Sequence, residues 1–168
     1  FDNLPIFMGV LNITPDSFSD GGKFNEKSSA KKQINKLILD GAKIIDVGGE
    51  STRPGSKEIL QTKEWLRVNK VMSYLKSKNF FVSLDTRKSF VMKKASKYKL
   101  DLINDVSGLS YDQETIEFLK KTKLPFVLNH MKGNTETMQK NPNYNNVLLD
   151  IYDYFEDKLR LIRKSGIK

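Results

Sequence analysis

Short apolar runs alternate with longer stretches of helical periodicity along the chain. Each run has four to seven residues, is largely apolar in both alternating positions, and is bounded by Gly, Pro, Asn or Asp. Strands that are buried on both faces of a parallel sheet have this pattern. We therefore predict five strands, at residues 6–11, 43–47, 80–84, 100–106 and 125–128.

The stretches that follow these runs place apolar residues three or four positions apart, as one face of a helix requires. Gly41 and Gly166 come where a glycine commonly ends a helix, at the close of the first stretch and of the last. The predicted helices span residues 28–40, 58–76, 88–98, 113–121 and 145–164.

This alternation contains no linker and no low-complexity segment, so it predicts one parallel α/β domain. Two architectures compete for it. An open doubly wound sheet would be complete within 168 residues, whereas a (β/α)8 barrel needs eight units and about 250 residues. Length alone favours the open sheet, and the motifs described next favour the barrel.

Polar residues follow every predicted strand at its carboxyl end. In both architectures this end of a parallel sheet faces the ligand. Acidic and amide groups at the ends of apolar strands are costly to desolvate unless they meet a ligand or one another. We therefore predict a binding site there, built from residues 12–22, 46–55, 85–87, 104–108 and 129–133.

Lysine and arginine number 29 against 20 aspartate and glutamate residues, which gives a net charge of +9. The excess is mostly lysine on the predicted helices, and aromatic residues do not interleave with it as a stacking surface for nucleic acid requires. Solvated helix faces account for this charge, so we expect no nucleic-acid partner. The positive field can still attract a polyanionic small substrate.

The chain has no cysteine, which excludes disulfides and thiolate metal sites and fits a reducing compartment. It has no apolar run of about 18 residues, so we expect no membrane span. A secretory signal pattern is also missing. These observations favour a cytoplasmic location.

Two long motifs carry a family resemblance. The segments MGVLNITPDSFSDGG (residues 8–22) and DVGGESTRPG (residues 46–55) resemble the first two signatures of the dihydropteroate synthases, and residues 130–144 resemble the stretch after that family's fifth strand. The similarity extends from residue 6 to about residue 165. It implies a (β/α)8 TIM barrel of which about five units are present, with residues 1–168 forming one pterin-binding domain that is incomplete at its C-terminus.

The resemblance also implies an activity. These transferases of folate biosynthesis, the targets of sulfonamides, join 6-hydroxymethyl-7,8-dihydropterin diphosphate to 4-aminobenzoate and release diphosphate. They work with Mg²⁺ as homodimers when full length. Because the family's later pterin-binding residues would follow Lys168, we expect the 168-residue chain alone to have little activity.

The matching positions imply site residues for the pterin diphosphate. Asp85 and Asn104 match the residues that read the pterin edge, and Thr52 and Arg53 match the pair that contacts the diphosphate. Asn12 matches the residue that contacts magnesium. The resemblance therefore places pterin reading and diphosphate handling on different strand ends.

The other implied site residues lie in the first two loops. Phe18 and Pro54 would line the aminobenzoate pocket, and Asp20 joins Asn12 and Arg53 as a catalytic candidate. A pair of glycines, Gly21 and Gly22, makes the first loop suited to hinge motion.

Structural roles remain open for several of these residues. Asp85 could cap the helix that begins near residue 88, and Asn104 could be a turn residue. Arg53 could be a solvated loop charge and Phe18 simple loop packing. We expect His130, the one histidine, to pack or position rather than to catalyse.

We expect Asp46 to orient the loop that holds residues 51–53 rather than to bind a ligand. Two other functions stay open for the whole chain. One is a pterin-binding methyltransferase that uses methyltetrahydrofolate, against which the diphosphate loop argues. The other is a non-catalytic pterin-binding paralogue.

Overall fold

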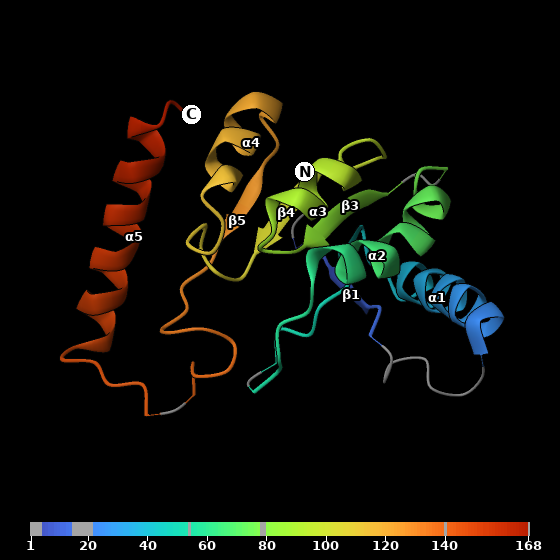
Figure 1. Ribbon diagram of the computed structural model, residues 1–168, viewed down its shortest axis with the longest axis horizontal. Helices are drawn as coiled ribbons and strands as arrows, with labels where there is room; N and C mark the ends of the chain where they lie inside the picture. Colours follow the sequence, from blue (N-terminus) through green and yellow to red (C-terminus); the bar gives the residue numbers. More distant parts are fainter. Residues whose placement is uncertain (1–4, 15–21, 54, 78–79, 140, 168) are drawn as a thin grey trace.

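Five strands and five helices alternate along the described part of the chain, as the hydrophobic pattern predicts (Figure 1). The structure is a computed structural model that describes residues 5–14, 22–53, 55–77, 80–139 and 141–167, with the backbone alone for residues 22–27. The elements are β1 (Met8–Asn12), α1 (Gly22–Leu39), β2 (Ile44–Gly48), α2 (Gln61–Leu75), β3 (Phe81–Asp85), α3 (Ser89–Ala95), β4 (Leu102–Asp105), α4 (Glu114–Thr122), β5 (Phe126–Leu128) and α5 (Val147–Lys164).

The strand order distinguishes the two candidate architectures. The sheet runs β1-β2-β3-β4-β5, and every neighbouring pair is parallel. In a doubly wound sheet the chain reverses direction and adds strands on the other side of the first one. A sheet in sequence order is instead the wall of a (β/α)8 barrel. The barrel prediction is therefore confirmed, and the open sheet that length favoured is wrong.

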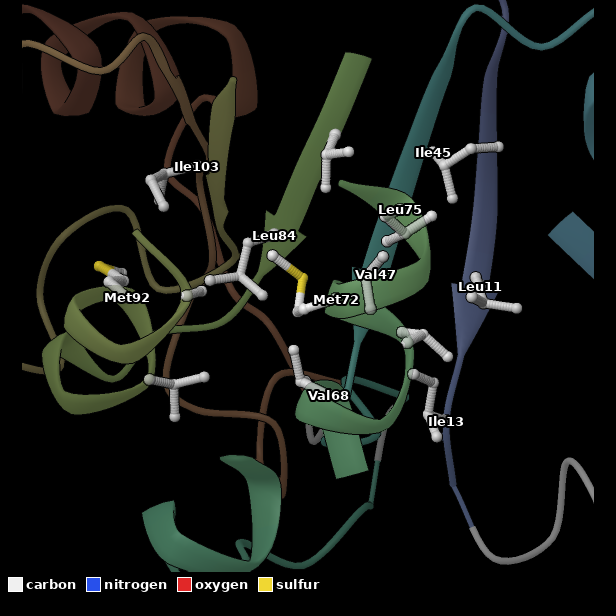
Figure 2. Packing of buried hydrophobic residues seen from close by; sticks show 14 of the residues in the cluster. Leu11, Ile13, Ile45, Val47, Val68, Met72, Leu75, Leu84, Met92 and Ile103 are labelled. Carbon is white, nitrogen blue, oxygen red and sulfur yellow. The ribbon is translucent and has the colours of Figure 1, made fainter. Parts of the chain in front are cut away.

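One face of this wall carries the core. Alternate strand residues such as Leu11, Val47 and Leu84 are at most 1% exposed, and they lie with Val68 and Met72 of α2 in one apolar cluster (Figure 2). Burying each of these side chains contributes about 1.5–3 kcal/mol. The core thus fixes which face of each strand turns towards the helices.

The other strand face is the interior of the barrel. It carries Met8, Val10 and Phe81, which are 37%, 52% and 45% exposed. It also carries the polar residues at the carboxyl ends of the strands. The alternation of strand side chains therefore aims the predicted site residues away from the helices and towards the barrel axis.

Helix α5 lies at the β5 edge of the wall (Figure 1). It buries Ile162, whereas Leu148 and Tyr152 are 75% and 65% exposed. Positive φ values of 99° at Gly41 and 88° at Gly166 confirm the two predicted helix ends. None of the helices in the described ranges has the combination of length and apolar character that crossing a membrane requires.

Candidate active site

One register row of the sheet carries the predicted polar residues. Asn12 pairs with Gly48, Gly48 with Asp85, and Asp85 with Asn104 across four neighbouring strands. Paired residues of parallel strands point to the same face of the sheet. Asn12, Asp85 and Asn104 therefore lie side by side on the barrel side, at the carboxyl end of the wall.

Gly48 makes room in this row for its neighbours. A Cβ atom at Gly48 would lie 3.0 Å from Oδ1 of Asn12 and 3.3 Å from Oδ2 of Asp85. The side chains of Asn12 and Asp85 therefore extend over Gly48 from the two strands that flank it. The absence of a side chain at position 48 brings the amide and the carboxyl group towards each other.

The charged groups that act most strongly on Asp85 are other carboxylates. Burial, followed by the charges of Asp46 and of Glu64, raises its pKa from 3.8 to about 7. Among the described residues, nothing donates a hydrogen bond to its buried Oδ1 atom. A buried acceptor without a partner costs about 1–3 kcal/mol, so this oxygen is suited to a ligand that brings its own N–H donors.

Asn104 is fixed by hydrogen bonds on both sides. Its Nδ2 atom donates to Oδ2 of Asp46 over 3.0 Å, and its Oδ1 atom accepts from Nδ2 of Asn129 over 3.1 Å. Burial raises the pKa of Asp46, against the opposing effect of its polar neighbours, among them Asn104. These contacts fix the orientation of the Asn104 amide and leave its second Nδ2 hydrogen for a ligand.

Both structural alternatives for Asp85 and Asn104 are wrong. The N-cap position of α3 is Lys88, which makes no side-chain cap, so Asp85 does not cap that helix. The turn after β4 belongs to Asp105, whose Oδ1 atom accepts from the backbone N–H of Ser107 over 2.8 Å and from its hydroxyl over 2.6 Å. Asn104 is a strand residue.

The loop between β2 and α2 holds Thr52, half-buried, and Arg53, exposed. The hydroxyl of Ser56 donates to the carbonyl of Ser51 over 2.6 Å, and the N–H of Ser56 donates to the carbonyl of Arg53 over 3.0 Å. These bonds fold the loop back on itself. Thr52 and Arg53 are thus placed by the loop, whereas Asp85 and Asn104 are placed by the sheet.

The expectation that Asp46 orients this loop is wrong. Its carboxylate accepts from Asn104 on the barrel side of the sheet instead. The anchor of the loop is Glu50, whose Oε1 atom accepts from the backbone N–H of Ile59 over 2.8 Å and whose Oε2 atom accepts from Nζ of Lys88 over 2.9 Å. Glu50 lies past the strand end, where its side chain reaches the residues that precede α2 and α3.

Sequence reasoning missed the buried charges of Glu50, Glu64 and Lys88, which are 6%, 0% and 3% exposed. One signal was present in the sequence. Glu64 lies four positions before Val68 and eight before Met72, in line with the apolar face of its helix. A carboxylate on such a face predicts a buried cation partner, but the identity of the partner depends on the tertiary fold.

Three predicted site residues, Phe18, Asp20 and Pro54, lie outside the described residues. His130 lies among aromatic rings, with its centroid 4.7 Å from that of Tyr154 and 6.0 Å from that of Tyr144. This environment agrees with the packing role that we expect for the histidine.

A magnesium ion fits the donor set only if the substrate supplies most of the ligands. The described residues contain no group of three His, Cys, Asp or Glu side chains that could hold a metal. The Oδ1 atom of Asn12 lies over Gly48 at the open end of the barrel wall. A single hard oxygen there suits Mg²⁺, which usually keeps several waters and binds substrate phosphates.

Comparison with known proteins shows the family of this chain. The pterin-binding enzyme family matches residues 8–168. The chain belongs to this family. The dihydropteroate synthase of Haemophilus influenzae is 39% identical over 167 residues, which cover 99% of this chain and 60% of that relative. The synthase of Escherichia coli is 42% identical over 164 residues, 97% of this chain and 58% of that relative.

Solved structures of family members share the fold. The Yersinia pestis dihydropteroate synthase, determined with a sulfonamide drug, superposes with a TM-score of 0.88 at 38% identity, over 98% of this chain and 60% of that one. The Xanthomonas albilineans enzyme, determined with 4-aminobenzoic acid, gives 0.87 at 33% identity, over 98% and 58%. The chain therefore spans about 60% of the length of these relatives.

Proposed function

We propose that the protein is a dihydropteroate synthase and that this chain supplies its pterin-reading and diphosphate-handling residues. The carrying observation is the row of Asn12, Asp85 and Asn104, with an unpaired carboxyl oxygen at its centre. The similarity to synthases solved with a sulfonamide and with 4-aminobenzoic acid supports this choice.

The pterin ring would sit against Asp85 and Asn104. Its amino-pyrimidinone edge offers N–H donors to a carboxylate and a donor–acceptor pair to an amide. A site built around such an edge rejects analogues that lack it, because buried polar groups are then left unpaired. The ionised form of Asp85 accepts these hydrogen bonds, so pterin binding should strengthen as the pH rises through about 7.

The diphosphate would lie towards Thr52 and Arg53. Arginine offers a bidentate fork to phosphate oxygens, and a threonine hydroxyl adds a donor. In the reaction the bond between the pterin methylene carbon and the diphosphate oxygen breaks. A bond from the amine nitrogen of 4-aminobenzoate to that carbon forms, and the nitrogen gives up a proton to water. The loop then stabilises the departing negative charge.

Asn12 would hold Mg²⁺ together with the diphosphate and water, and the bound ion would neutralise phosphate charge. Asp20, with Phe18 and Pro54 for the aminobenzoate, completes the proposed site. We include in the same proposal a cytoplasmic homodimer and a barrel domain that extends beyond these residues. Sedimentation of the natural-length protein tests the oligomer.

Calorimetry on the natural-length protein tests the function. A synthase should bind 6-hydroxymethyl-7,8-dihydropterin diphosphate in a Mg²⁺-dependent manner and convert it with 4-aminobenzoate to dihydropteroate. Binding without turnover would favour a non-catalytic paralogue. Preferential binding of methyltetrahydrofolate would favour the methyltransferase.

A further inference from the structure

The ammonium group of Lys88 is buried and uses all of its hydrogen-bonding capacity within the protein. Its Nζ atom donates to Oε2 of Glu50 over 2.9 Å, to Oε2 of Glu64 over 2.8 Å and to the carbonyl of Ile59 over 2.8 Å. A lysine has three N–H donors. Lys88 therefore has none left for a substrate, although it follows the pterin-binding Asp85 by only three residues.

These contacts close the loop between β2 and α2 into a ring. Glu50 stands at the first end of the loop and Ile59 at the last. The N–H of Ile59 donates to Glu50, and its carbonyl accepts from Lys88. Both backbone groups of Ile59 are thus held by two buried side chains, and Thr52 and Arg53 lie in the loop that these contacts close.

The same group ties the ring to the end of β3. Oε1 of Glu64 accepts from the hydroxyl of Thr86, the residue after Asp85. Arg87 reaches Oε2 of Glu50 through Nε over 3.4 Å. The diphosphate loop and the pterin-reading strand end are therefore joined to each other by buried contacts.

Close packing leaves this joint little freedom. A Cβ atom at Gly49 would lie 2.8 Å from Cγ2 of Val68 and 2.9 Å from the carbonyl oxygen of Glu64. The start of the loop is thus pressed against α2. A change in the buried charges should be transmitted to the loop, because the surrounding packing cannot absorb it.

We propose that Lys88 is a positioning residue that holds Thr52 and Arg53 at a set distance from Asp85, so that one substrate meets the diphosphate loop and the pterin row together. This inference rests on the proposed synthase function. Lys88 does not touch the substrate in this role. It sets the geometry in which the two halves of the pterin diphosphate bind at once.

The effect of removing Lys88 on ligand affinity should depend on whether the ligand carries the diphosphate. If Lys88 is removed, the loop shifts relative to the sheet, and the loop contacts to phosphate weaken. The hydrogen bonds to the pterin ring come from the sheet and should persist. A general loss of folding would instead weaken binding of the pterin with and without diphosphate alike.

Calorimetry at pH 8 on the natural-length protein makes this test. It compares the Kd of 6-hydroxymethyl-7,8-dihydropterin diphosphate with the Kd of the same pterin alcohol without diphosphate. In Lys88→Met the preference for the diphosphate form should fall by about tenfold or more, since misplacement by about 1 Å can cost as much as a hundredfold. The Kd of the pterin alcohol should change by less than about twofold, because its contacts come from the sheet.

Lys93→Met is the matched control, because Lys93 is an exposed α3 lysine that pairs with exposed Glu114. It should keep the wild-type preference. If Lys88→Met does not fold, Glu50→Gln decides the question, since it keeps an oxygen for Ile59 and removes the charge that Lys88 meets. An unchanged preference in the folded variants would overturn the positioning role. Wild-type protein that binds neither pterin would instead overturn the synthase function.

Discussion

Two groups of buried charge each contain residues from near the carboxyl ends of β2 and β3, and they are built in opposite ways. In the paired group, which consists of Glu50, Glu64 and Lys88, every side chain meets an opposite charge within 2.9 Å. In the acidic group, which consists of Asp46 and Asp85, no cation is in contact among the described residues, and the pKa of both carboxyl groups is raised by burial.

The difference shows what buried charge is used for in this protein. Burial also raises the pKa of Glu64, but its hydrogen bonds from Lys88 and Thr86 act in the other direction. The paired group therefore joins the loop after β2, helix α2 and the segment before α3. The charged forms of the carboxyl groups in the acidic group are disfavoured, as is common at functional sites. Four substitutions would break or sharpen this contrast.

The largest effect is expected for Lys88→Met. Removing Lys88 leaves buried Glu64 without a counter-ion and leaves Glu50 with Arg87 alone, so the free energy of unfolding should fall by about 3–5 kcal/mol. Urea denaturation at pH 7 measures the loss. A loss below about 1 kcal/mol, which is the range of an exposed ion pair, would mean that the paired group does not hold these segments together. Lys93→Met provides that exposed reference.

A smaller loss is expected for Asn104→Asp, which adds a third carboxyl group to the acidic group. The variant loses the N–H that Asp46 accepts and brings a negative charge beside Asp85. The free energy of unfolding should fall by about 2–3 kcal/mol at pH 8, and by less at pH 5, which lies below the raised pKa of Asp85. Equal losses at the two pH values would contradict a charge effect. Asn35→Asp, at an exposed position, is the control.

Asp85→Asn should stabilise the fold while it weakens pterin binding. The carboxyl group titrates at about 7 in the folded chain and ordinarily at 3.8. Below pH 3.8 both states hold the proton, so the variant gains little. As the pH rises towards 7, the unfolded chain loses the proton first, and wild-type stability falls.

Above pH 7 this cost is complete, so the variant should be more stable by about 1–2 kcal/mol. Urea denaturation at pH 4 and pH 8 measures the difference, and calorimetry measures the pterin affinity. A variant that is less stable than wild type at pH 8 would mean that Asp85 has a structural partner.

The smallest effect is expected for Tyr111→Phe at the rim of the paired group. The hydroxyl donates to Glu58, and the ring lies under the guanidinium of Arg87 at 4.4 Å. Tyr111 is 42% exposed, and phenylalanine keeps the ring. The free energy of unfolding, measured by thermal denaturation, should change by about 0.5 kcal/mol or less. A larger loss would mean that the contact of Tyr111 with Glu58 stabilises the protein as the buried pairs do.

Much of the fold could be predicted because it depends on local pattern. The apolar runs located all five strands to within two residues at each end, and the helical periodicity located the five helices. The first helix is the largest miss, because it begins at Gly22 rather than at residue 28. Residues 22–27 carry few apolar side chains, so periodicity gives no signal there.

The site could be predicted only in part. The motifs indicated Asn12, Asp85 and Asn104, and the register confirms that these three share one row. The role of Asp46 was predicted wrongly. Position next to a motif suggested a loop anchor, but strand alternation turns Asp46 towards the barrel side, where it meets Asn104.

The sequence by itself determined the alternation of strands and helices, the polar ends of the strands and the family resemblance. The tertiary structure decided which buried charges are paired. Glu50 follows β2, Glu64 lies in α2 and Lys88 precedes α3, and they are separated by up to 38 positions along the chain. Whether a buried carboxylate has a lysine partner or none depends on distances across the fold. Periodicity carries no information on such distances, because it reports only which face of its own element a residue occupies.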